Sequence, residues 1–194
     1  MSTPRSLRND GPKADRFGPR YRDGMIYSAP QTGVATVTVG NGVLYAHPVW
    51  WPGGAILTSL CAAASSGGGA GSVVRLGAFR DNGEGAPGNL LVDAGTIDTT
   101  GTTPGSISLT TVIPEDGWYW PSGVAQGAPT PNPTMRMSVP LVPPFHPTIA
   151  SLFGGTTIGL YKTGVTGALP ATFGDPAADS ANNVIRVGFT ITNA

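Results

Sequence analysis

Residues able to act as a nucleophile or a general base are scarce in this chain. It contains two histidines, His47 and His146, each followed by proline, and a single cysteine, Cys61. A serine or cysteine nucleophile needs a base within hydrogen-bond reach, and the apolar run 56–64 around Cys61 carries no Lys, Arg or His. The sequence therefore predicts a buried, inert thiol and no catalytic residues.

Carboxylates are the second group that could do chemistry, as an acid–base pair or as ligands of a cation. The candidates all fall at expected turns or strand ends: Asp81, Glu84, Asp93, Asp98, Glu115 and Asp116. The segment 81–85 offers alternating oxygen ligands but lacks the second acid and the terminal glutamate of an EF-hand calcium loop. We expect no metal site, no cofactor and no enzymatic activity, with a glycosidase pair as the minor alternative.

Two adjacent tryptophans are the side chains best suited to binding. Trp50 and Trp51 lie in the segment 47–54, which is rich in Pro and Gly and is expected to be a loop. Exposed rings there would stack on a sugar, and Asp175 and Asp179 would hydrogen-bond its hydroxyl groups. The alternative is that these residues pack into the core or against neighbouring chains.

The composition favours one domain that is built largely from strands and turns. The chain has 194 residues, with 29 glycines and 19 prolines, yet 40% of its residues are hydrophobic. A chain of this length can bury a sizeable core without disulfides or metals. Charged residues make up only 11% and balance to zero, so nothing in the overall charge indicates nucleic-acid binding.

The first 28 residues differ from the rest in charge and pattern. Residues 1–24 carry six basic and three acidic residues, and residues 1–28 lack hydrophobic periodicity. We expect 1–28 to be an extended arm that anchors the protein on a partner protein, and 29–194 to be a single domain. The expected anchoring residues are Arg5, Arg8, Arg16, Phe17, Arg20 and Tyr21. Neither a leader peptide nor an apolar membrane span is expected.

Short apolar runs separated by turn signals predict the fold of the domain. Expected strands cover residues 33–39, 43–46, 56–64, 72–79, 89–93, 106–112, 117–125, 135–139, 156–161 and 184–192. Gly-Asn-Gly at 40–42 predicts a hairpin between the first two strands, and no segment has the periodicity of a helix. Turn signals at intervals of about 8–12 residues are typical of all-β proteins. We expect an antiparallel, jelly-roll-like β-sandwich.

Two segments resemble known proteins. Residues 72–98 contain a strand, an Asp-Asn-Gly turn and a Pro-Gly-x-Leu-Leu-x-Asp stretch, and residues 164–173 read Gly-Val-Thr-Gly-Ala-Leu-Pro-Ala-Thr-Phe. Both resemble segments of tailed-bacteriophage virion proteins of the tail-fibre, minor-tail and head-spike type, and the likeness covers about residues 43–192. It implies a structural protein of the particle, with no catalytic residues to carry over, and a homo-oligomer, with a trimer favoured.

The resemblance leaves several roles open. The first is a fibre, spike or tail accessory protein on the virion surface that displays the sandwich for host attachment. Loops 47–55, 126–134 and 163–183 would then cluster at one end and contact cell-surface carbohydrate. The second is a capsid decoration protein that stabilises the head lattice. A free carbohydrate-binding module is the lesser alternative, and neither a membrane nor nucleic acid is expected as a partner.

Overall fold

The computed structural model describes residues 21–127, 129–140, 159–174, 177–181 and 183–193. These residues form strands and turns and no helix, which confirms the all-β prediction. The strands are β1 (Tyr27–Ser28), β2 (Gln31–Thr38), β3 (Leu44–Ala46), β4 (Val49–Trp51), β5 (Ile56–Ala62), β6 (Ala64–Ser66), β7 (Val73–Asp81), β8 (Pro87–Asp98), β9 (Gly105–Val112), β10 (Gly117–Gln126), β11 (Thr134–Pro140), β12 (Gly159–Lys162), β13 (Ala177–Ala181), β14 (Val184–Ile185) and β15 (Gly188–Thr192).

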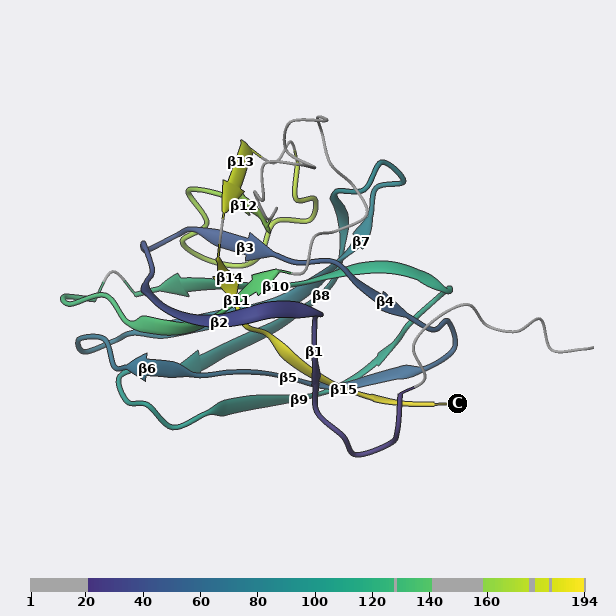
Figure 1. Ribbon diagram of the computed structural model, residues 1–194, viewed down its shortest axis with the longest axis horizontal. Helices are drawn as coiled ribbons and strands as arrows, with labels where there is room; N and C mark the ends of the chain where they lie inside the picture. The colour runs from purple at the N-terminus through teal and green to yellow at the C-terminus, as the bar shows by residue number, and fades with distance from the viewer. Residues whose placement is uncertain (1–20, 128, 141–158, 175–176, 182, 194) are drawn as a thin grey trace, which may run out of the picture.

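The strands form three antiparallel sheets that pack together, as expected for a β-sandwich. One sheet has the order β1-β15-β5-β9, and a seven-stranded sheet has the order β13-β12-β3-β10-β7-β8 with β4 also paired to β10. A third has the order β14-β11-β2, with β6 paired to β11. In Figure 1, β5, β9 and β15 lie in a layer below β7, β8 and β10. The jelly-roll connection pattern stays a prediction.

The seven-stranded sheet is buried on both faces. Along β10, Tyr119 and Ala125 face the main core, while Trp120 and Val124 face a second cluster, because side chains alternate along a strand. The main core also contains buried leucines and aromatics of β5, β7 and β15. The second cluster is completed by the segment 163–174, which forms no named strand there. Long apolar runs in β7 and β10 reflect this two-sided burial.

The turn between β7 and β8 forms as the sequence predicts. One oxygen of Asp81 accepts hydrogen bonds from the amides of Gly83 and Gly85, at 2.7 and 3.4 Å. The side-chain oxygen of Asn82 accepts two more from the following backbone, at 2.8 and 3.2 Å. Gly83 has a φ of +88°, a conformation that favours glycine. The turn is therefore held by its own polar side chains.

Two sequence predictions about connections are wrong. The turn at 40–42 joins β2 and β3, but these strands belong to different sheets, so it forms no hairpin. The loops 47–55 and 126–134 lie at opposite ends of β10, since Gly53 donates to Asp116 near its start and Gly69 donates to Pro131 beyond its end. Because β10 is ten residues long, these loops cannot form one binding surface.

Candidate functional site

The root of the N-terminal segment is built into the core. Tyr21 is only 8% exposed, and its hydroxyl donates to the carbonyl oxygen of Trp50 at 2.7 Å. Its ring packs edge-on against Tyr27, with centroids 4.8 Å apart, and against Phe189. Burial and the neighbouring Tyr27 raise the pKa of Tyr21, so the phenol stays protonated and remains a donor. Tyr21, expected to anchor a partner, therefore anchors the chain to its own domain.

The two ends of the described chain meet at this root. The amide of Asn193 donates to the carboxylate of Asp23 at 3.0 Å, and its side-chain nitrogen donates to the carbonyl of Tyr21 at 2.7 Å. In addition, the amide of Arg22 donates to the hydroxyl of Tyr27 at 2.8 Å. β1 then pairs with β15, so the first sheet begins before residue 29, the expected domain boundary. The chain that precedes Tyr21 is thus attached at a well-fixed point.

Trp51 corrects one of the expected binding residues. Its side chain is 0% exposed, stacks on Tyr119 with centroids 5.1 Å apart, and meets Phe189 edge-on at 5.3 Å. The segment forms strand β4 rather than a loop, and alternation directs Val49 and Trp51 inward. Trp51 is a core residue and cannot contact a ligand.

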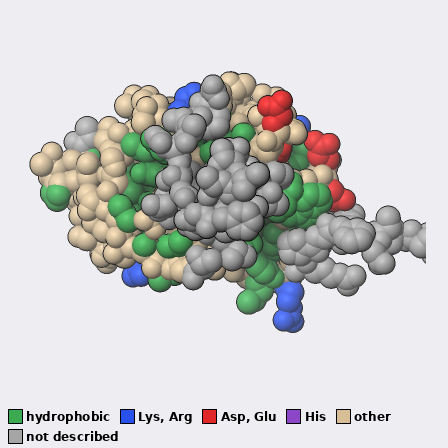
Figure 2. All heavy atoms as spheres, turned by 45° about the horizontal axis from the view of Figure 1, so that its top comes forward, with side chains coloured by type: hydrophobic (Ala, Val, Ile, Leu, Met, Phe, Trp, Pro, Cys, Tyr) green, Lys and Arg blue, Asp and Glu red, His purple; other side chains and the backbone are tan. Residues whose placement is uncertain are grey.

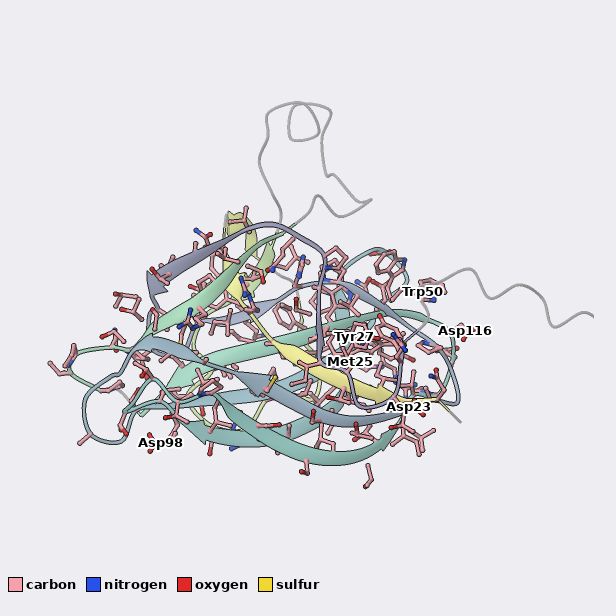
Figure 3. The ribbon with its side chains drawn as sticks, turned by 60° about the horizontal axis from the view of Figure 1, so that its bottom comes forward. Asp23, Met25, Tyr27, Trp50, Asp98 and Asp116 are labelled. Carbon is pink, nitrogen blue, oxygen red and sulfur yellow. The ribbon has the colours of Figure 1, made fainter. Side chains whose placement is uncertain are left out.

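Trp50 faces the other way and remains a candidate. It is half-buried, and its ring meets that of Trp118 edge-on, with centroids 5.6 Å apart. The two residues lie directly opposite each other in the β4–β10 pairing. Figure 3 places Trp50, Tyr27, Asp23 and Asp116 toward one end of the molecule, whereas Asp98 lies toward the other. The aromatic pair therefore lies at the end where the N-terminal segment is rooted.

Sequence reasoning placed Trp118 only by strand pattern and missed this pairing. The register of β4 against β10 brings Trp50 and Trp118 together, although 68 positions separate them. The available signal was that Trp50 and Trp51 are adjacent, because on a strand one of two neighbouring side chains must face outward.

Several expected residues lie outside the described part of the chain. These are Arg5, Arg8, Arg16, Phe17, Arg20 and Asp175. Asp179 lies in β13, which pairs with β12, but its side chain is not among those described. Their binding and anchoring roles stay predictions.

Several of the carboxylates that are candidates for an acid–base pair have structural partners. Asp93 forms an ion pair with Arg75 at 3.1 Å, and Asp116 accepts from the amide of Gly53 at 2.6 Å. The second oxygen of Asp81 accepts from the indole of Trp120 at 2.9 Å. Within the described ranges, no three His, Cys, Asp or Glu side chains gather where a metal ion could bind.

The two other reactive groups are held in their neutral forms. His47 is 5% exposed, and desolvation lowers its pKa to about 4. Desolvation also raises the pKa of the half-buried Cys61. An imidazole with so low a pKa is a weak base, and a thiol that stays protonated is a weak nucleophile.

The segments 72–98 and 164–173 dock against each other. Leu90 donates to the carbonyl of Ala171 and Phe173 donates to that of Gly88, each at 2.9 Å. The amide of Leu169 donates to Asp93 at 3.0 Å. The 164–173 segment therefore packs on this chain's own sheet and is not free to bind a partner through these groups.

Few charged side chains are visible among the described residues on the face that Figure 2 shows. In Figure 2, Lys and Arg side chains lie apart from one another, while acidic side chains gather toward one edge. Within the part of the chain that the structure describes, no helix has the length and hydropathy needed to cross a membrane.

Comparison with known proteins finds no matching family model and no curated relative.

Proposed function

We propose that this chain is a structural component of a tailed bacteriophage or phage-derived particle. Its N-terminal arm attaches to the particle, and its β-sandwich is displayed outward for host attachment as a fibre, spike or tail accessory protein. The resemblance of residues 72–98 and 164–173 to virion proteins supports this proposal. The docking of these two segments makes them one structural unit, so their joint occurrence has a physical reason.

The observation that carries the proposal is the fixed root at Tyr21. An arm displays a domain in a defined orientation only if the junction between them is rigid. Here the junction is held by the buried ring of Tyr21 and by hydrogen bonds to Trp50 and Asn193. Whatever holds the preceding residues would therefore hold the sandwich in a fixed orientation.

Deletion of residues 1–20 tests the anchoring role. The cut preserves Tyr21, so the truncated protein should fold with an unchanged midpoint of thermal unfolding. Particles assembled with it should lose the protein, as measured by mass spectrometry of purified particles and by immunogold electron microscopy. Arg80→Gln, an exposed change within the sandwich, serves as the control and should be incorporated normally. Normal copy number of the truncated protein would refute the proposal.

The same labelled particles separate the two structural roles. Label on the tail or on a head spike favours host attachment. Label distributed over the whole head would instead support the decoration role, in which the sandwich stabilises the capsid lattice.

A further inference from the structure

A hollow of about 250 Å³ opens where the first and third sheets meet. Residues from β5, β11 and the chain leading into β15 line it, together with the exposed side chain of Ile26 before β1. The lining residues used below are Ile26, Cys61, Ala63, Arg136, Arg186 and Gly188.

The hollow exists because two paired strands separate there. β5 and β15 are paired at Cys61 and Gly188, and beyond this point β11 bridges them. The amide of Arg136 donates to Ala63, and the amide of Arg186 donates to the carbonyl of Arg136, each at 3.0 Å. A Cβ on Gly188 would lie 2.6 Å from the sulfur of Cys61. The floor is thus closely packed, and its small side chains leave the space above it open.

The charge of this hollow is not balanced by the described residues. Two arginines line it and no acidic residue does. Among the residues that the structure describes, the guanidinium of Arg186 makes only a long contact, 3.5 Å, to the carbonyl of Met137, and its buried Nε has no hydrogen-bond partner. Arg75 also has an unpartnered Nε, but Asp93 neutralises its charge at 3.1 Å. Arg186 has no such counter-ion in the described part of the chain.

We propose that the hollow binds a carboxylate carried on a short apolar body. A carboxylate accepts paired hydrogen bonds from a guanidinium. Beside Arg136 and Arg186 it would supply the negative charge that the lining of the hollow lacks. Ile26, Cys61 and Ala63 offer an apolar surface to the carbon atoms of the ligand. The volume lies below the ~300–1,000 Å³ of pockets for drug-sized molecules, so the ligand is a short aliphatic acid or the C-terminal residue of a polypeptide.

NMR titration of the full-length, 15N-labelled protein tests the proposal. Hexanoate represents the free acid, and N-acetylglycylleucine represents a polypeptide C-terminus. Hexylamine has an apolar chain of similar length with the opposite charge. We expect saturable shifts of the amides of Ala63, Arg186 and Gly188 with at least one acid and none with hexylamine. Binding of the peptide alone identifies a C-terminal residue as the ligand, whereas hexanoate binding at least as tightly identifies a free acid.

Variants separate the charge from the shape of the hollow. Arg186→Gln should weaken binding about tenfold or more, since a charged hydrogen bond contributes about 1.5–3 kcal/mol. Arg136→Gln, at an exposed position, gives a second reading if the first variant is unstable, and Ala63→Leu should block the hollow. Arg80→Gln is the control and should bind like the unaltered protein. Three results would overturn the proposal: no saturable shift with either acid, equal shifts with hexylamine, or unchanged affinity in both Arg186→Gln and Arg136→Gln.

Discussion

The two faces of the seven-stranded sheet are buried by different means. One face packs against a second sheet, where Leu60 of β5 and Phe189 of β15 share one core with Trp51 and Tyr119. The other face is covered by the segment 163–174, whose Leu169 and Phe173 reach back to the sheet. The first closure depends on side-chain packing between strands. The second combines the packing of a few side chains of an irregular segment with hydrogen bonds to the edge strand β8.

This difference predicts which part of the molecule is rigid and which part can open. The packed face contains more buried residues, and it includes the root of the N-terminal segment. Regions with fewer buried apolar contacts open at lower free-energy cost. We therefore expect the 163–174 cover to open locally while the two-sheet core and the arm's root remain closed.

The largest expected effect comes from the packed face. Trp51→Ala removes a fully buried ring that contacts Tyr119 and Phe189. It should lower the free energy of unfolding by about 3–5 kcal/mol, measured by urea unfolding followed by far-UV circular dichroism. A loss below about 1 kcal/mol, the scale of a surface change, would contradict the assignment of Trp51 to the core.

Leu169→Ala tests the other face and should have a smaller effect on global stability. Its side chain is 5% exposed, and its end lies against Gly77 of β7. We expect a loss of about 2–4 kcal/mol in the free energy of unfolding. Hydrogen exchange should also quicken at Leu90 and Phe173, whose amides bond across this contact. Ala168→Ser, at an exposed position, is the control.

Hydrogen exchange decides whether the two faces differ as proposed. If Leu169→Ala quickens exchange at Leu90 and Phe173 but leaves the β5–β15 amides protected, the cover opens separately. Equal acceleration throughout would mean that both faces unfold as one unit, and the comparison would fail.

His47, which lies between β3 and β4, makes the stability of the protein depend on pH. Burial holds its pKa at about 4, whereas in the unfolded chain it is about 6.5. Between these values the unfolded chain binds more protons, so the free energy of unfolding falls as the pH drops. The contribution of neutral His47 to the free energy of unfolding is complete above pH 6.5. About 2–3 kcal/mol of this stability should be lost by pH 4.5. Urea unfolding at pH 7.5 and 4.5 measures the loss.

His47→Gln is the matched comparison for this pH dependence. The variant lacks the titrating imidazole, so its stability should fall less between the two pH values than that of the unaltered protein. An equally steep fall in the variant would show that carboxylates, and not His47, cause the dependence.

Local signals in the sequence predicted much of this fold. The β7–β8 turn forms as expected because Asp81, Asn82 and Gly83 determine it within a few residues. The all-β class was predictable for the same reason, since alternation and turn residues act over short distances. The expected strand 89–93 was too short, because β8 continues to Asp98.

The errors arose where distant segments meet. Strand β4 has three residues, too few for alternation to be recognised, so Trp51 was assigned to a loop. Tyr21 looked like part of a free arm because its partners, Trp50, Phe189 and Asn193, lie far along the chain. The hollow beside Arg136 and Arg186 had no local signal, because it forms only where β5, β11 and β15 meet.

The smallest expected effect on stability, and the sharpest contrast with Trp51, comes from Trp50. Its ring faces outward and packs on Trp118, and an aromatic pair contributes about 0.5–1.5 kcal/mol beyond its buried area. Trp50→Ala should therefore reduce the free energy of unfolding by only about 1 kcal/mol.

If the ring of Trp50 contacts carbohydrate, Trp50→Ala should lose binding to bacterial surface polysaccharides on a glycan array. Val112→Ala, a change at an apolar position that is 59% exposed, should retain it. Unfolding as severe as that of Trp51→Ala would make Trp50 a core residue. Unchanged glycan binding would instead exclude its ring from the contact.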